Sequence, residues 1–333
     1  MKGQNFYESV HLLRGIAAIM VLIAHHWAWY CQLPGIGWLS NLAEIRYFAR
    51  VGVIVFFVIS GFVLPLSLVN GYHLRCYPKF LAKRFIRIEP TYIASIVISL
   101  GLLILGTSFS PNGIPHAIEV KRLFAHLLYL IPFTDFDWYN GVYWTLAIEF
   151  QFYLLIAFLF PVWRVSYALS IIVAVGFSCL YFLRDVVPEI ELFAHAPLFG
   201  MGMLSLSVIK SKSMAQRLAG FVIILIIATS YGLHTKAYLM AATALATVSL
   251  IVYWRPPRIK ARYLGSISYS LYIIHFPIGQ IIHRTAKHFL GSESHPLLYL
   301  AMLFSIALSL LIAHFLYQFI EKPSQIWSKK ISY

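Results

Sequence analysis

The chain has 333 residues, of which 60% are hydrophobic and 11% carry a formal charge, and its mean hydropathy is +0.77. A water-soluble domain has about 25% charged residues, so the composition excludes an ordinary soluble globular protein. The net charge of +14 raises the question of a nucleic acid partner. Most basic residues, however, flank apolar segments, as they do on one side of membrane proteins. We therefore expect a lipid bilayer around the chain and no nucleic acid partner.

Apolar runs of about 20 residues, the length that crosses a bilayer as an α-helix, recur along the whole chain. They predict an all-α polytopic membrane protein with about ten transmembrane helices in a single domain over residues 1–333, without a fused soluble domain. The predicted helices span about 10–30, 47–69, 91–110, 143–161, 166–184, 190–208, 218–235, 237–254, 264–284 and 297–320. A shorter apolar piece at 123–133 is predicted to be re-entrant or interfacial.

The connections between the predicted helices alternate in charge. The 70–90 and 255–262 connections are strongly basic, whereas acidic residues such as Asp135, Asp137 and Glu189 fall on the other connections. Since Lys and Arg gather on the cytoplasmic side, both termini are predicted to be cytoplasmic. The basic rim serves topology and contact with anionic lipid, or it docks an anionic cytoplasmic substrate.

Cysteine usage indicates neither a disulfide framework nor a metal site. The three cysteines, Cys31, Cys76 and Cys179, are odd in number and lack the spacing of metal ligands. We expect no metal and no tightly bound cofactor.

The first predicted helix carries polar residues within its apolar run. Arg14 and His25 are separated by three helical turns plus roughly 20°, so they share one face about 16 Å apart along the axis. Alone, Arg14 would snorkel to the headgroups and His25 would make an interhelical hydrogen bond; together they favour a polar channel. His26, about 100° away, is interpreted as structural or interfacial, with the aromatic residues of 27–30 forming a belt at the outer edge.

Glu149 adds a carboxylate within the membrane. In GVYWTLAIEFQFYLL it lies about 9 Å below the outer boundary, a depth similar to that of His25. An isolated carboxylate there is costly, whereas a His–Glu pair orients an imidazole and stabilises its protonated form. We expect Glu149 to be the partner that orients His25.

Two further patterns place polar side chains at helical spacing. In LGSISYSLYIIHFPIG of the ninth predicted helix, Tyr272 and His275 share a face with Ser268, although such residues also serve as interhelical glue. In the 70–90 connection, KRFIRIEP places Arg84 and Arg87 one helical turn apart, just before the third predicted helix. This spacing suits bidentate binding of a phosphate, or simple anchoring at the inner face.

Six motifs occur in a fixed order along the chain. They are Arg14 and His25 in LLRGIAAIMVLIAH, FFVISGF at 56–62, Arg84 and Arg87 in RFIRIEP, WTLAIEFQFYLL at 144–155, SYSLYIIHFP at 268–277 and FIEKP at 319–323. With these motifs the chain resembles the acyltransferase 3 family of integral membrane acyltransferases, which O-acylate bacterial surface glycans and related acceptors.

The resemblance implies that His25 is the catalytic histidine and that Arg14, Arg84 and Arg87 handle an acyl-CoA donor. It implies acetyl-CoA as a co-substrate, a surface glycan or a lipid-linked glycan precursor as the acceptor, and a location in the bacterial inner membrane.

Two acidic positions of the family are present here, and two other positions depart from its pattern. Glu149 and Glu321 match the acidic positions, whose roles in the family are less defined. His11 stands where many members have Asp, and Glu89 stands where members often have an aromatic residue. Both departures change the charge of the implied donor site, and neither touches His25.

The residues and the resemblance lead to one mechanistic hypothesis. The phosphates of CoA dock on Arg84 and Arg87, the pantetheine arm runs past Arg14, and the thioester lies near His25. His25 removes the proton from an acceptor hydroxyl that attacks the thioester, and Glu149 orients the imidazole.

Other readings of the same residues stay open. Tyr272 or Ser268 is expected to donate to the oxyanion, and His275 is a further candidate of undefined role. An acyl-histidine intermediate is an alternative to direct transfer. Intramembrane Arg, His and Glu also occur in proton-coupled carriers, so a transporter or flippase for a glycan or small anion is the rival function. A structural subunit of an envelope complex would leave the polar stripe unexplained.

Overall fold

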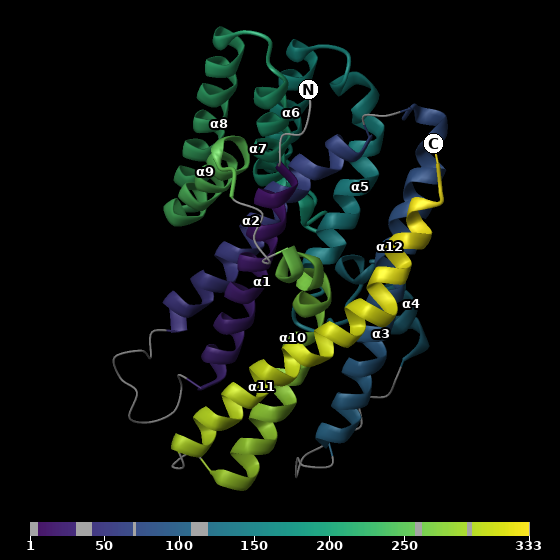
Figure 1. Cartoon of the computed structure of the whole chain (residues 1–333), viewed down its shortest axis with the longest axis vertical. Coiled ribbons are helices and arrows are strands. Elements are labelled where there is room, and N and C mark those ends of the chain that lie inside the picture. Colours follow the sequence, from purple (N-terminus) through teal and green to yellow (C-terminus); the bar gives the residue numbers. More distant parts are fainter. Residues whose placement is uncertain are drawn as a thin grey trace.

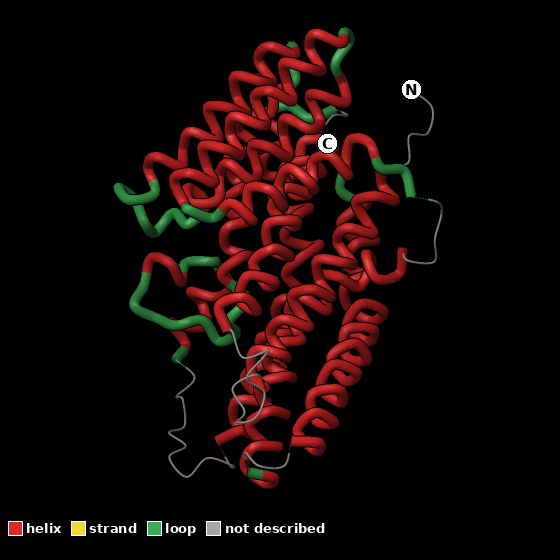
Figure 2. Tube along the Cα trace, turned by 90° about the vertical axis from the view of Figure 1, so that its left-hand side faces the viewer, coloured by secondary structure: helices red, strands yellow, loops and turns green. Residues whose placement is uncertain are grey.

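The computed structural model describes residues 6–30, 42–68, 71–107, 119–256, 262–291 and 295–332, and the regular elements in these ranges are all helical (Figures 1 and 2). The helices are α1 (Phe6–Tyr30), α2 (Leu42–Leu68), η1 (Leu74–Cys76), α3 (Tyr77–Thr107), α4 (Val120–Leu127), η2 (Ile131–Phe133), α5 (Trp144–Trp163), α6 (Tyr167–Cys179), η3 (Leu180–Leu183), α7 (Leu192–Lys210), α8 (Met214–Thr235), α9 (Tyr238–Tyr253), α10 (Arg262–Leu290), α11 (His295–Leu316), η4 (Tyr317–Glu321) and α12 (Lys322–Lys329). The predicted all-α fold is confirmed.

Each of the ten predicted helices corresponds to a helix of the structure. In the described ranges, 7 helices are long and apolar enough to cross a membrane. Of the other three predicted spans, α6 and α9 are shorter apolar helices. The third, α10, carries serines, tyrosines and histidines through its middle and a basic last turn. A polar helix such as α10 is tolerated when it is buried by its neighbours rather than by lipid.

The predicted start of the third helix is wrong. This helix is predicted to begin at residue 91, after Pro90, but α3 begins at Tyr77 and continues through Pro90. Proline interrupts one backbone hydrogen bond without ending a membrane helix when its surroundings satisfy the freed carbonyl. A similar case is Pro161 in α5, where the hydroxyl of Tyr72 donates to the Ala157 carbonyl (2.8 Å), four residues before the proline.

The helices form two packed groups. One core joins α2, α5, α6, α7, α8 and α9 with the first half of α1, and another joins the rest of α1 to α10, α11 and part of α3. Close backbone contact holds α2 against α7 in the first group. A Cβ atom at Gly61 would lie 2.1 Å from the Phe199 carbonyl oxygen, so this contact requires glycine.

The chain ends of the bundle gather at one end of the long axis. The start of α1 and the last turns of α12 both lie toward the upper end of the view in Figure 1. At this end Ser9 donates to the Trp254 carbonyl (2.6 Å), which joins the start of α1 to the end of α9. Cys31 and most of the basic 255–262 connection lie outside the described residues.

A short element interrupts the bundle between α3 and α5, as predicted for 123–133. It consists of α4 and the turn η2, which expose the apolar side chains of Phe124, Leu128 and Phe133. Tyr129 points the other way: its φ of 55° turns the chain, and its ring is buried in a stack with Tyr92 and Phe150.

Candidate active site

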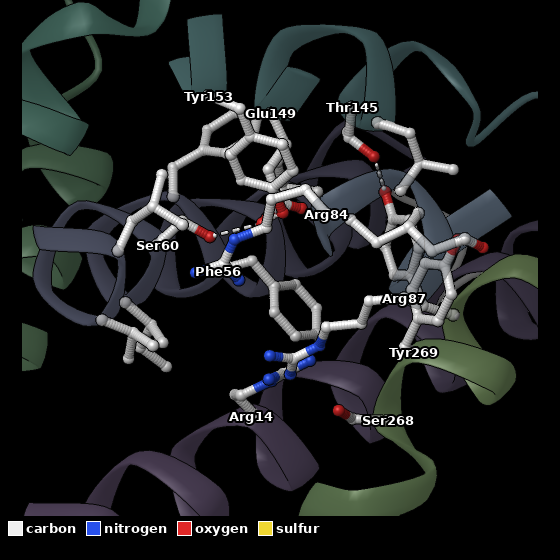
Figure 3. Close-up of a pocket in the computed structure, with 18 of the residues that line it drawn as sticks. Arg14, Phe56, Ser60, Arg84, Arg87, Thr145, Glu149, Tyr153, Ser268 and Tyr269 are labelled. Carbon is white, nitrogen blue, oxygen red and sulfur yellow. Dashed lines mark hydrogen bonds between the residues drawn. The ribbon is translucent and has the colours of Figure 1, made fainter. Parts of the chain in front are cut away.

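A cavity lies where the two helix groups meet (Figure 3). Side chains from α1, α2, α3, α5, α10, η4 and α12 line it. The predicted site residues found in its wall are Arg14, Arg84, Arg87, Glu149, Ser268, Tyr272 and Glu321. The structure therefore brings most of the predicted site together from five different regions of the sequence.

Three arginines give this cavity its positive charge. Figure 3 shows the guanidinium groups of Arg14, Arg84 and Arg87 pointing into the same space. Arg84 and Arg87 belong to α3 itself rather than to a loop before it, and Arg84 is only 8% exposed. The predicted placement of this pair in a connection before the third helix is therefore wrong, because the helix that carries them starts earlier.

Fixed contacts hold the arginine side chains. Arg84 donates to the Ser67 hydroxyl (2.5 Å) and lies over the rings of Phe80 and Tyr153. Guanidinium groups in an enclosed space raise the local concentration of anions.

The carboxylate of Glu149 is held on one wall of the cavity. It accepts hydrogen bonds from the Ser60 hydroxyl (3.0 Å) and the Tyr153 hydroxyl (2.6 Å), and the first of these is drawn in Figure 3. The expected pair between Glu149 and His25 is not made. A catalytic role of Glu149 therefore stays a prediction. In this role its carboxylate would act on a molecule bound in the cavity rather than on the His25 imidazole.

Glu321 is the second carboxylate of the cavity, and an irregular turn places it there. It ends the π-helical turn η4 and is 3% exposed. Its Oε2 accepts from both the backbone N–H (3.2 Å) and the hydroxyl (2.5 Å) of Ser270, and its Oε1 accepts from Gln325 (2.9 Å). With three donors, this carboxylate is stabilised inside the protein. Single π-turns of this kind are frequent at functional sites.

His25 lies beyond the cavity wall, paired with His275. The Nδ1–H of His275 donates to the Leu271 carbonyl (3.1 Å), so its Nε2 carries a lone pair. That nitrogen lies 3.0 Å from Nδ1 of His25, which must be the donor. In a neutral imidazole this leaves Nε2 of His25 unprotonated. The pair thus fixes one tautomer, in which His25 offers a free basic nitrogen.

The close approach of α1 and α10 makes this pair possible. A Cβ atom at Gly279 would lie 2.1 Å from the Trp29 ring and 2.8 Å from the His26 imidazole, so only glycine allows this spacing. Beside it, Pro277 frees the Ile273 carbonyl four residues earlier, and the side-chain amide of Asn140 donates to that carbonyl (2.8 Å). Asn140 thereby satisfies the backbone carbonyl that Pro277 leaves free in α10, next to His275.

Tyr272 separates the cavity from the histidine pair. Its hydroxyl lies 2.9 Å from that of Thr145, which itself donates to the Val142 carbonyl (3.0 Å), so Tyr272 is the donor of the first bond. The hydroxyl of Ser268 donates to the Gly265 carbonyl (2.8 Å). Both predicted oxyanion donors therefore have their protons engaged within the protein, and their catalytic role stays a prediction.

His26 and the aromatic residues after it pack inward. His26 is fully buried, and its Nδ1 donates to the Leu22 carbonyl (2.9 Å). Trp29 stacks on His283 and Tyr30 is 1% exposed. The expected lipid-facing belt is therefore wrong for Trp29 and Tyr30, because the neighbouring α10 covers this face of α1. A structural role for His26 agrees with its position.

Comparisons with known proteins identify the family of this chain. The family described as an acyltransferase domain, acyltransferase 3, matches residues 7–314. The chain belongs to this acyltransferase 3 family. An O-acetyl transferase of Shigella phage Sf6 is 26% identical over 97% of this chain and 96% of its own length. Nodulation protein 10 of Rhizobium leguminosarum bv. viciae is 32% identical, over 49% of this chain and 48% of its own length. No solved structure matches.

The site of this family member contains residues that the sequence analysis did not single out. Ser60 lies in the FFVISGF motif and Tyr153 follows Glu149 by one helical turn, so both had a signal in the sequence. Thr145 and Asn140 had none, because their roles depend on contacts with α10. Glu89, one of the two positions that depart from the family pattern, is 2% exposed. It lines a small side cavity that shares Arg84 with the main cavity.

Proposed function

We propose that this chain is a transmembrane O-acyltransferase that moves an acetyl group from cytoplasmic acetyl-CoA to a hydroxyl of a surface glycan or of a lipid-linked glycan precursor. The observation that carries the proposal is the paired His25 next to a cavity lined by three arginines. A proton acceptor and an anion-binding cavity are the two parts that acyl transfer from CoA requires.

Acetyl-CoA fits the cavity by its charge and shape. Its phosphates would bind the guanidiniums of Arg84 and Arg87, with charge-assisted hydrogen bonds that are about twice as strong as neutral ones. The pantetheine arm would lie along α10 past Arg14 and Ser268, which brings the thioester to Tyr272. The phage relative's printed activity, O-acetyl transfer, supports acetyl as the transferred group.

His25 would act as the general base through its free Nε2. That nitrogen takes the proton from the acceptor hydroxyl while the hydroxyl oxygen attacks the thioester carbonyl. When the tetrahedral intermediate collapses, the C–S bond breaks and the thiolate of CoA takes the proton back from the imidazolium. His275 supports the step because its lone pair accepts the Nδ1–H of His25 throughout.

Proteoliposomes that contain the purified chain test this function. Given acetyl-CoA with a labelled acetyl group and an envelope glycan fraction, the wild-type protein is expected to label the glycan, and His25→Ala is expected to reduce labelling at least 10³-fold, within the range seen for loss of a general base. Replacing Arg84 and Arg87 by Ala is expected mainly to raise the KM for acetyl-CoA.

The same experiment separates the proposal from its rival. Movement of labelled substrate across the vesicle membrane without any transfer to glycan would indicate a transporter. Full activity of His25→Ala would remove the mechanism. An unchanged KM in the double arginine variant would place the donor elsewhere.

A further inference from the structure

A second pocket lies between α3 and α10 next to the histidine pair. Ser99 and Leu103 line it from α3, Tyr139 lines it from the segment before α5, and Phe276, Gln280 and Arg284 line it from α10. None of these residues belongs to the arginine-lined cavity. The pocket is therefore a separate compartment.

One face of α10 passes through both compartments. Tyr269 and Tyr272 line the arginine cavity, and Phe276, Gln280 and Arg284 line the second pocket. These positions are three to four residues apart, so they form one continuous stripe along the helix. His275 lies at the junction. The two compartments therefore meet at the imidazole pair from opposite directions along the helix axis.

A single aromatic ring stands between the second pocket and His25. The ring of Phe276 lines the pocket and contacts the His25 imidazole edge-on, with 5.3 Å between centroids. On its other side it contacts the Trp29 ring, also at 5.3 Å. A group in the pocket is thus one side chain away from the proposed base.

The wall opposite α10 is firmly built. The Tyr139 ring stacks on His126 with 4.3 Å between centroids, and Arg122 lies over it at 4.2 Å. The backbone N–H of Tyr139 donates to His126 (3.0 Å). Its buried hydroxyl has no hydrogen-bond partner among the described residues. An aromatic face with a free hydroxyl suits a ligand that presents both C–H groups and hydroxyls.

The charge of the pocket is positive. Arg284 is the residue that carries a formal charge among those that line it. Gln280 adds an amide that donates and accepts. Arg284 lies eight residues beyond Phe276, about 12 Å along the helix, which is roughly the length of a sugar ring with its substituents.

We propose that this pocket is the acceptor subsite, and that it takes a sugar ring bearing an anionic group, either a carboxylate or a phosphate. Arg284 binds the anion, Tyr139 and Gln280 bind the ring, and a ring hydroxyl reaches His25 past Phe276. This inference rests on the proposed acyl transfer, because it names the acceptor of the same site.

Two variants with matched controls test the subsite. Leu103→Trp fills the pocket from α3, and its control is Val97→Trp, on an exposed position of the same helix. Arg284→Gln removes the charge, and its control is the nearby Lys287→Gln outside the pocket. Both pocket variants are expected to lower acetyl transfer to envelope glycan at least tenfold. The controls are expected to transfer as the wild-type protein does.

Binding of labelled acetyl-CoA is measured in the same preparations. All four variants are expected to bind acetyl-CoA with wild-type affinity, which shows that they are folded and that the donor site is intact. If the wild-type protein transfers no acetyl group, the proposed function fails. If it does transfer, and both pocket variants match it, the subsite alone fails.

Competition identifies the acceptor class. Methyl glucuronide and glucose 6-phosphate are expected to inhibit transfer to glycan about tenfold more strongly than methyl glucoside, and Arg284→Gln is expected to abolish this difference. Stronger inhibition by the glucuronide indicates an acidic sugar, and stronger inhibition by the phosphate indicates a phosphorylated acceptor. Equal inhibition by all three compounds overturns the anionic preference.

Discussion

The tautomer of His25 depends on a backbone carbonyl that His25 itself does not contact. The Leu271 carbonyl fixes the proton of His275 on Nδ1, and the free Nε2 of His275 fixes the proton of His25. Because both imidazoles are neutral in this arrangement, no carboxylate is needed to select the tautomer. His275 therefore acts as a positioning residue.

Replacing His275 by Ala removes the acceptor for the Nδ1–H of His25. The kcat is expected to fall about 10²-fold, because the imidazole loses both its orientation and its preferred tautomer. The KM for acetyl-CoA is expected to stay within twofold, since the arginine cavity is untouched. The measurement is the pH profile of kcat, in which the low-pH limb, where the general base becomes protonated, should move relative to the wild-type protein.

The matched control is His26→Gln. His26 is buried beside the pair, and its Nδ1 donates only to its own helix, so the variant should retain at least a third of the wild-type kcat. His275→Gln, whose amide oxygen can accept the same proton, should recover part of the lost rate. A wild-type pH profile in His275→Ala would show that the pair has no positioning role.

For single residues, the sequence predicted the position of a side chain along its helix better than its contact partner on a neighbouring helix. The eleven-residue spacing predicted that Arg14 and His25 lie apart along one helix, but they do not share the single polar channel that was expected, because Arg14 lines the cavity and His25 lies beyond its wall. The expected partner of His25 was wrong, because a similar depth in the membrane does not define which way a side chain faces. Glu149 instead faces Ser60 and Tyr153.

Among the elements, the π-turn η4 positions a buried charge. Glu321→Ala would leave the backbone N–H and hydroxyl of Ser270 without their acceptor. An unsatisfied buried donor costs about 1–3 kcal/mol, so a clear fall in the thermal unfolding midpoint is expected. The control is Ser324→Ala, because that buried hydroxyl donates only to its own helix (2.7 Å). Equal midpoints for the two variants would contradict the assignment.

The α4 segment, outside the membrane-spanning helices, contains a pH-sensitive contact. His126 is fully buried, its Nδ1 donates to the Arg122 carbonyl and its Nε2 accepts from the Tyr139 N–H. Protonation of Nε2 would place its N–H against the N–H of Tyr139, so that two donors would face each other. Burial, with the nearby charge of Arg122, lowers the pKa of His126 to about 4 from its ordinary value of 6.5.

This pKa shift predicts a loss of stability in acid. Since the folded pKa is depressed, the contribution of neutral His126 is complete above about pH 6.5 and is lost as the pH falls toward 4, on the order of 1–3 kcal/mol. Thermal unfolding between pH 7.5 and 4 measures it. His126→Gln is expected to flatten this part of the curve, and an unchanged slope would place the titration at another residue.

The helices themselves were largely predictable, because the length of each apolar run in the sequence determines where a helix lies. The ten predicted helices and the short piece at 123–133 are all present. The start of α3 was missed, because Pro90 suggests a helix boundary when the side chains that compensate it are unknown. Likewise, nothing in the local sequence marks the π-turn at Tyr317–Glu321, which depends on the contact of Glu321 with Ser270.

At the scale of the whole molecule, charge separates the two ends of the bundle. Near the start of α3, Arg164 donates to the Tyr72 carbonyl (2.8 Å), and Lys210 at the end of α7 lies over the ring of Trp163. These contacts gather basic residues at the end of the bundle that contains α12. The positive-inside rule predicts that this end is cytoplasmic. In that orientation acetyl-CoA would enter the arginine cavity from the cytoplasm and the acceptor would approach from outside.

Cysteine labelling in intact cells tests this orientation. In a background without the three native cysteines, Asp135→Cys and Lys236→Cys are expected to react with a membrane-impermeant maleimide added outside. Lys212→Cys and Lys329→Cys are expected to react only after the membrane is permeabilised. All four positions are exposed, so a failure to react reflects the membrane rather than burial. Labelling of Lys329→Cys in intact cells would reverse the orientation. It would then place the arginine cavity outside, where no acetyl-CoA is supplied, and the direction of acyl transfer proposed here would fail with it.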